Sequence, residues 1–298
     1  MKKLLFVPFL LILMVACSSN PPKDKIQKTT TLNQVKRKPH LFAQELVIQP
    51  GHVKKVEFFW PSSWGKLIVS CKNKSLHLAR QGDRLFGFLA ETYHSKLRPY
   101  QCNAKGAGKE FVAINAKVKK FPFKFETLNV DKKRVNLNAK DLKRWRKEVA
   151  ELKKVYNSLK VKQVLFDSAF VSPLNSKITS LYGKARLFNN NKKSWHNGID
   201  FRAATGTPIT VANKGEVVFT GDLFFNGNTV IVDHGLGIIS LYCHLSKIGV
   251  KKGDMVEQGE LVGLAGATGR VTGPHLHWGV RINGDWINGL SLVEESQR

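Results

Sequence analysis

The chain has 298 residues, of which 42% are hydrophobic and 10% aromatic, so a chain that is disordered throughout is excluded. Its 48 Lys and Arg residues against 22 Asp and Glu residues give a formal net charge of +26, which excludes an acidic, solvating chain. The basic excess is uneven: residues 1–164 hold 35 basic and 11 acidic side chains, whereas residues 165–298 hold 13 and 11. We therefore expect roughly two domains that face different partners.

The first residues, MKKLLFVPFLLILMVACSSN, have the pattern of a signal peptide. The apolar run from Leu4 to Ala16 is shorter than the ~20 residues that a membrane-spanning helix needs. Cys17 follows it directly and resembles the lipid-modified cysteine of a bacterial lipobox, although Met14 stands where Leu is usual. We expect residues 1–17 to form a lipoprotein signal segment that is cleaved before Cys17, whose thiol is then lipidated; an ordinary signal peptide with an incidental cysteine is the alternative. Ser18 resembles the second residue of lipoproteins sorted to the outer membrane, facing the periplasm.

Residues 18–40 are rich in Lys, Thr, Asn and Pro, as expected of a flexible tether. Residues 41–128 alternate short apolar runs with turn residues such as Pro50-Gly51, which predicts a small antiparallel β domain of the sandwich type. Its histidines, at positions 52, 77 and 94, have no metal-ligand spacing, so we expect no chemical role for them.

Four cysteines are present, and an exported compartment permits disulfides. If Cys17 carries lipid, Cys71 and Cys102 form the natural pair, because both lie in the predicted β domain. Cys243 then remains as a buried thiol in an apolar strand. There is no CxxC motif or Cys/His cluster, so a cysteine metal site is not indicated.

Residues 129–163 contain a predicted helix from near Asn138 to near Lys160. One face of it is apolar at three- and four-residue steps: Leu142, Trp145, Val149, Leu152, Tyr156 and Leu159. A helix of this kind could bind a partner or a membrane surface. The favoured interpretation is an amphipathic connector that packs its apolar stripe on its own domains.

From residue 164 to 298 short strands alternate with frequent glycines and prolines, which predicts an almost wholly β domain. Five of the nine histidines fall here, at positions 196, 234, 244, 275 and 277. His196 and Asp200 would lie about 13 Å apart in an extended strand, from ~3.3 Å per residue, so joint metal binding requires a bend at Asn197-Gly198.

His275 and His277 are two residues apart, so in a strand they point to the same face. Such a pair provides either two metal ligands, or one metal ligand and a second histidine that lies beside it without binding the metal. A catalytic zinc keeps three protein ligands and one open position, which His196, Asp200 and one of these two histidines satisfy. The other histidine and His244 are then free for proton transfer, an arrangement suited to metal-assisted hydrolysis. Spacing does not decide which histidine takes which role.

Three motifs, HNGID, YCHL and TGPHLHW, occur in this order within a segment from about residue 174 to 292. Together they resemble the signature of the lysostaphin-type, or LytM-type, zinc endopeptidases of peptidoglycan. The resemblance implies an antiparallel β-sheet peptidase domain in which His196, Asp200 and His277 bind Zn²⁺. It also implies that His244 and His275 line the site, activating water and stabilising the tetrahedral intermediate, while His234 is structural.

The favoured function is a lipid-anchored zinc endopeptidase that cuts peptidoglycan cross-links. The expected location at the outer membrane suggests that the bond cut is the D-alanyl–diaminopimelate bond. The alternative is a non-catalytic or latent LytM-like regulator that activates cell-wall amidases; the five filled site positions argue against it. Nucleic acid is not an expected partner, because the basic excess lies in the tether, the β domain and the helix rather than on a recognised binding fold. We expect it to attract anionic envelope polymers.

Overall fold

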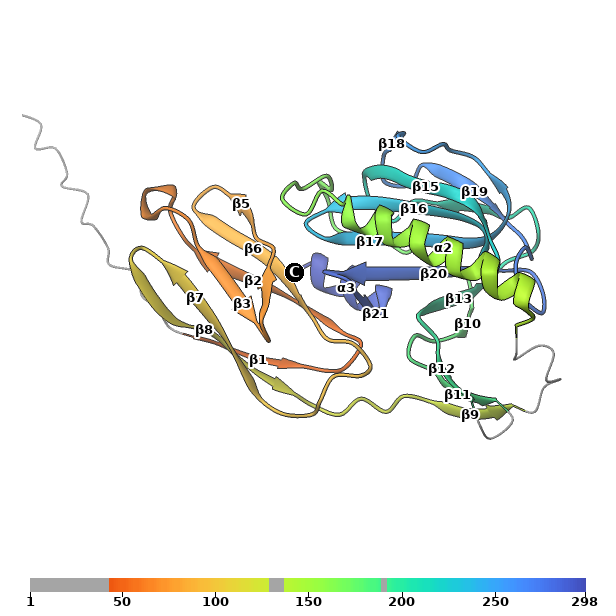
Figure 1. The fold of residues 1–298 in the computed structure, drawn as a ribbon. Coiled ribbons are helices and arrows are strands. Elements are labelled where there is room, and N and C mark those ends of the chain that lie inside the picture. Colours follow the sequence, from red (N-terminus) through yellow and green to blue (C-terminus); the bar gives the residue numbers. More distant parts are fainter. Residues whose placement is uncertain (1–42, 129–136, 189–191) are drawn as a thin grey trace, which may run out of the picture. The chain divides into compact units, whose positions relative to one another are not determined.

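The computed structural model describes residues 43–128, 137–188 and 192–298 (Figure 1). The predicted signal peptide, Cys17 and the predicted tether lie outside these ranges. All of the described residues belong to one compact unit. The predicted mainly β fold is confirmed, with two α-helices in the described part of the chain. No helix there is long and apolar enough to cross a membrane. The division into domains at residues 128 and 163 stays a prediction.

Residues 44–118 form two sheets with a shared apolar core that includes Val56, Trp60, Val69 and Ile114. One sheet has the order β1 (Gln44–Ile48), β8 (Lys109–Val118), β7 (Tyr100–Gly106), β3 (Ile68–Cys71) and β4 (Lys74–Leu76). The other has the order β2 (Val53–Phe59), β6 (Arg84–Ala90) and β5 (Ala79–Gln81), and a 3₁₀ turn, η1 (Ser62–Trp64), follows β2.

The prediction of a wholly antiparallel β domain is wrong at one pair, because β1 and β8 run parallel. The turn at Pro50-Gly51 carries the chain from one sheet to the other, so β1 and β2 do not form a hairpin with each other. The structure joins Cys71 and Cys102, which are direct partners in the β3–β7 ladder, by a disulfide, and leaves Cys243 as a buried free thiol.

The second half of the chain forms a ten-stranded sheet in which every pairing is antiparallel. Its main path is β10 (Ile178–Ser180), β13 (Gly198–Arg202), β20 (His275–Ile282), β17 (Ile238–Ile248), β16 (Gly227–Gly235), β15 (Gly215–Leu223) and β18 (Met255–Val256). Beside it, β14 (Pro208–Thr210) pairs with β19 (Leu261–Ala265), β19 with β17, and β21 (Asp285–Ile287) with β20.

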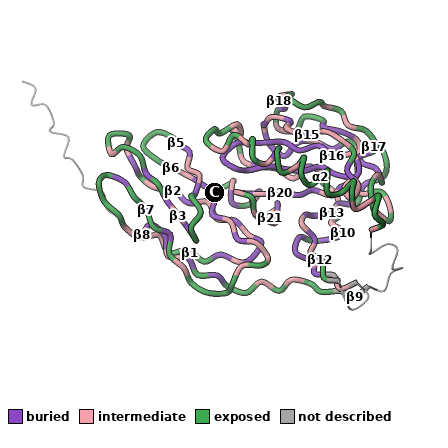
Figure 2. The backbone as a smooth tube through the Cα atoms, in the orientation of Figure 1, coloured by how far each residue is buried: buried purple, intermediate pink, exposed green. Residues whose placement is uncertain are grey.

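The central strands β16 and β17 are buried along most of their length, as the purple segments in Figure 2 show. Continuous burial requires cover on both faces of the sheet. Helix α2 (Ala139–Asn157) supplies the cover on one face, where Val155 packs with Ile231, Ile239 and Leu241 (Figure 1). The larger core, which includes Tyr242 and Trp278, lies on the other face.

Helix α2 begins where it was predicted, because the side chain of Asn138 caps it by accepting a hydrogen bond from the backbone N–H of Asp141. The predicted apolar stripe is only partly buried. Trp145 and Val149 are 38% and 46% exposed, while Val155, which was not in the stripe, is 8% exposed. In the first half of the helix Arg144 donates a hydrogen bond to the carboxylate of Asp222.

Two features of the second half were not predicted. A short helix, α3 (Gly289–Ser296), buries Leu292 and contacts β2, where the hydroxyl of Ser291 accepts a hydrogen bond from the N–H of Val53. A three-stranded sheet joins β9 (Phe125–Leu128), β11 (Ala185–Phe188) and β12 (Lys192–Trp195), with β9 parallel to β11. This small sheet ends directly before His196.

Candidate metal centre

Three predicted site residues, His196, Asp200 and His277, converge on one point. His196 Nε2 lies 2.9 Å from Asp200 Oδ1 and 3.1 Å from His277 Nδ1, and the latter two atoms are 2.8 Å apart. In the described ranges these residues form the group of His, Cys, Asp and Glu side chains that could hold a metal ion. Two imidazole nitrogens and one carboxylate oxygen form a donor set that zinc accepts.

Strand pairing explains part of this geometry. Asp200 on β13 and His277 on β20 are direct partners in the antiparallel ladder, so their side chains leave the same face. His196 precedes β13 and returns to Asp200 through the bend at Asn197-Gly198. Gly198 makes the approach possible, because a Cβ there would lie 2.4 Å from the carbonyl oxygen of Trp278 and 2.8 Å from the ring of His277.

Backbone hydrogen bonds orient the first imidazole. The Nδ1 of His196 lies 2.9 Å from the carbonyl oxygen of Leu181, to which it donates. This bond fixes the tautomer of His196. The lone pair of Nε2 is then free at the point where the three candidate ligand atoms converge, which is the usual arrangement of a metal-binding histidine.

The protonation states also suit a cation. Burial alone would raise the pKa of Asp200, but its close contacts with the rings of His196 and His277 outweigh this effect and hold the pKa of the carboxyl well below its usual range. Burial lowers the pKa of His277, which favours the neutral imidazole. A deprotonated carboxylate and neutral imidazoles are the forms that bind metal ions.

His244 and His275 lie beside this group. Their ring centroids are 4.8 Å apart, and the His244 ring is 5.9 Å from that of His277. Each donates through Nδ1 to a backbone carbonyl, His244 to Thr268 at 3.0 Å and His275 to Gly273 at 2.9 Å, which leaves both Nε2 atoms as acceptors. His275 Nε2 is 3.8 Å from Asp200 Oδ1, so it faces the converging ligand atoms. Burial, followed by the nearby His277 and His275, lowers the pKa of His244 to about 3.

A bulge in β17 aims His244. Between Tyr242 and Leu245 this strand has one more residue than its partner β16 has between Asn228 and Val230. His244 adopts the left-handed conformation there, with φ of +64°, which is uncommon for a residue with a side chain. Strand β17 continues through the bulge to Ile248.

His234 lies away from the centre, as the resemblance implied. It is fully buried, with Nδ1 2.8 Å from the carbonyl oxygen of Lys214 and Nε2 2.8 Å from the hydroxyl of Ser240. Burial lowers the pKa of His234 to about 4. These contacts hold the turn between β16 and β17.

One aromatic contact near the centre was missed in the sequence. Tyr93, which follows β6, stacks on Trp195 with a centroid distance of 4.9 Å, and its hydroxyl donates to Asn197 Oδ1 at 3.3 Å. The ring of His94 is 5.6 Å from that of Trp195. Trp195 and Asn197 flank His196, so the first half of the chain contributes a wall beside the predicted ligand. Residues about a hundred positions apart carry no common sequence pattern that could have indicated this contact.

Comparison with known proteins places this centre in a family context. The family model described as "Peptidase family M23" matches residues 194–289, which include all five of these site residues. The peptidoglycan DD-endopeptidase ShyA of Vibrio cholerae is 43% identical over 121 residues, which cover 40% of this chain and 28% of that protein. The DD-carboxypeptidase/endopeptidase Mpg of Neisseria meningitidis is 43% identical over 98 residues, 33% of this chain and 23% of that protein. The chain therefore spans a minor part of the length of these relatives.

A solved structure from Pseudomonas aeruginosa, described as a candidate M23 peptidase, matches more of the chain. It has a TM-score of 0.61 and 30% sequence identity, and the match covers 83% of this chain and 95% of that one. The likeness therefore extends beyond the ten-stranded sheet.

Proposed function

The chain belongs to peptidase family M23, and on this premise we propose that it is a zinc-dependent endopeptidase that hydrolyses peptide cross-links of peptidoglycan. The observation that carries the proposal is the convergence of His196, Asp200 and His277 within the region matched by the family model. These residues would hold the zinc ion and leave a coordination position open, as catalytic zinc sites do.

A bound zinc ion would supply a Lewis acid and a water nucleophile that is available at neutral pH. The chain supplies the proton transfers. His244 and His275 are held by carbonyl groups at Nδ1, so each offers Nε2 either to accept a proton from the attacking water or, once protonated, to stabilise the oxyanion of the tetrahedral intermediate. We assign these two roles to the pair of histidines jointly.

The names of the relatives support the substrate class. ShyA is a peptidoglycan DD-endopeptidase and Mpg a DD-carboxypeptidase/endopeptidase, which favours the D-alanyl–diaminopimelate bond as the bond cleaved here. We further propose that Cys17 carries a lipid anchor that holds the enzyme at the outer membrane facing the periplasm. The basic N-terminal half would then contact anionic envelope polymers. The non-catalytic amidase regulator is less favoured, because all five site positions are filled.

Digestion of purified peptidoglycan tests the proposal. We expect the protein to release cross-linked muropeptides as monomers, to lose this activity with a chelator, and to contain about one zinc ion per chain, as a single three-ligand site requires. Mass spectrometry of the products identifies the bond. A protein that neither takes up zinc nor cleaves peptidoglycan when zinc is supplied would contradict the proposal and favour the non-catalytic alternative, and cleavage that a chelator leaves unchanged would contradict the role of zinc.

A further inference from the structure

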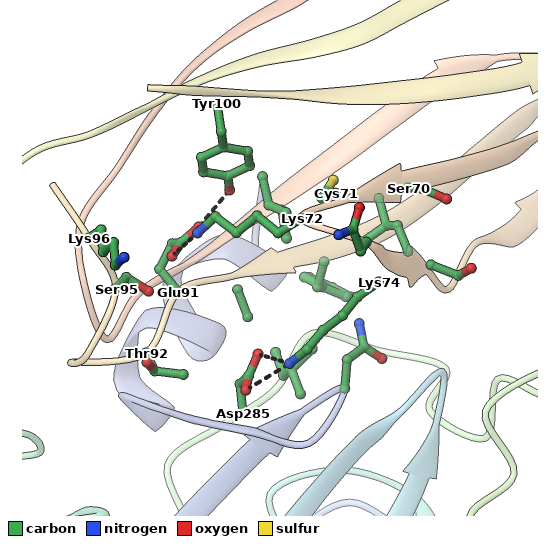
Figure 3. A pocket seen from close by; sticks show the side chains of 18 of the residues that line it. Ser70, Cys71, Lys72, Lys74, Glu91, Thr92, Ser95, Lys96, Tyr100 and Asp285 are labelled. Carbon is green, nitrogen blue, oxygen red and sulfur yellow. Dashed lines mark hydrogen bonds and ion pairs between the residues drawn. The ribbon is translucent and has the colours of Figure 1, made fainter. Parts of the chain in front are cut away.

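A cavity of about 770 Å³ lies outside the metal centre, between the β3–β4 turn, the segment after β6 and the β20–β21 turn (Figure 3). Its volume is in the range of sites that hold a small organic ligand. Lys72 in the β3–β4 turn and Lys74 at the start of β4 line the cavity, and so do Thr92, Ser95 and Lys96 from the segment after β6.

Both carboxylates of the cavity are already bound to cations of the chain. Glu91, which is 2% exposed, accepts hydrogen bonds from Lys72 at 2.6 and 2.7 Å and from the Tyr100 hydroxyl at 2.6 Å. Asp285 accepts from Lys74 at 3.1 and 3.2 Å. Figure 3 shows both groups, Glu91 with Lys72 and Tyr100, and Asp285 with Lys74. They neutralise four of the charges that line the cavity.

Lys96 and Arg98 are the remaining cations in the lining, and both are exposed. Among the described residues no carboxylate forms an ion pair with either of them. The cavity thus presents a net charge of about +2 from one ammonium and one guanidinium group, which bind carboxylate or phosphate oxygens. The ligand that matches this charge is an anion.

The neutral lining favours a peptide over a small inorganic anion. Backbone amide groups of a ligand would find partners in the hydroxyl and amide side chains of the lining. The polar partners include Ser70, Asn73, Thr92, Ser95, Gln101 and Asn103. Inorganic phosphate would leave most of the volume and most of these groups unused.

One segment connects the cavity with the metal centre. His94 lines the cavity and also contacts Trp195, while the adjacent Tyr93 stacks on Trp195 and binds Asn197. Cross-linked wall peptides carry free carboxylates in addition to the amide that is cut. We propose that this cavity is a second binding site for a carboxylate-bearing peptide of the wall, held by Lys96 and Arg98; this inference rests on the proposed function.

Calorimetric titration of the full, zinc-loaded chain in detergent tests the site. The probe is the uncross-linked peptide L-Ala-D-Glu-diaminopimelate-D-Ala, which lacks the cross-link. We expect the double variant Lys96→Gln/Arg98→Gln to weaken binding about tenfold, as loss of charge-assisted hydrogen bonds does. The matched control Lys117→Gln/Lys119→Gln removes two exposed cations outside the cavity and should bind as the parent chain does.

A second probe needs no variant. The same peptide with its carboxylates converted to amides should bind the parent chain about tenfold more weakly. Equal binding of the two peptides, or equal binding to the two double variants, would overturn the inference. So would inorganic phosphate that binds as tightly as the peptide with the same dependence on Lys96 and Arg98. Hydrolysis of a cross-linked peptide dimer, measured in parallel, reports on the proposed function independently of these affinities.

Discussion

Asp200 Oδ1 and His277 Nδ1 lie 2.8 Å apart because their residues are direct partners across the β13–β20 ladder. The pair is set by the register of two strands whose positions in the sequence differ by 77 residues. A shift of one residue in this register would turn one side chain to the opposite face of the sheet and dismantle the group.

Replacing His277 by Ala should therefore remove both zinc and activity. Replacing His244 should keep the zinc and lower the rate of hydrolysis about 10²- to 10⁴-fold, as expected for loss of a group that transfers protons. His244→Asn is the better variant, because Asn tolerates the left-handed backbone at this position. Metal analysis and muropeptide release measure the two effects, and a His277→Ala protein with full zinc and full activity would refute the ligand assignment.

Gly198 is expected to tolerate no side chain. The methyl group of Gly198→Ala would meet a backbone carbonyl at 2.4 Å and the His277 ring at 2.8 Å, so β13 and β20 must separate. We expect a loss of about 1–3 kcal/mol in the free energy of unfolding, together with weaker zinc binding. Gly249→Ala is the control, because its methyl group would make ordinary contacts of 3.5 Å or more. Equal stability and zinc affinity in both variants would contradict this account of the bend.

Cys71→Ala/Cys102→Ala should lower the free energy of unfolding by about 2–4 kcal/mol, because the disulfide closes a loop with a sequence separation of 31 residues in the unfolded chain. Urea denaturation measures the change. A reductant should destabilise the parent protein by a similar amount and leave the double variant unaffected. A reductant effect that persists in the variant would show that another thiol is responsible.

His234 should make the protein less stable in mild acid. Its folded-state pKa of about 4 lies below the ordinary value of 6.5, so the unfolded chain binds more protons between these two pH values. The stability that neutral His234 contributes is complete above pH 6.5 and is lost as the pH falls toward 4, on the order of 3 kcal/mol in total.

The variant His234→Gln isolates this effect. It is expected to reduce the pH dependence of the free energy of unfolding over that range, whatever its effect at pH 7. Denaturation at a series of pH values gives both slopes. Parallel slopes for the two proteins would exclude His234 as the source.

Local patterns were sufficient for some elements and misleading for others. The start of helix α2 at the Asn138 cap follows from the short-range rules of capping. Strand β7 carries no marked apolar alternation, because its buried positions are small residues, Cys102, Ala104 and Gly106, separated by exposed polar ones. The stripe on α2 was misjudged at Trp145, because whether an apolar residue is covered depends on where the helix docks.

The sequence by itself determined the mainly β class, the kinds of donor atoms at the centre and the family that carries them. Those properties follow from residue type and local spacing. Only the tertiary structure decided the pairing of Asp200 with His277, the bulge that aims His244, the contact of Tyr93 with Trp195 and the cavity lined by Lys96. Each of these depends on strands that are distant in the sequence and meet only when the chain folds, so no local periodicity encodes their register.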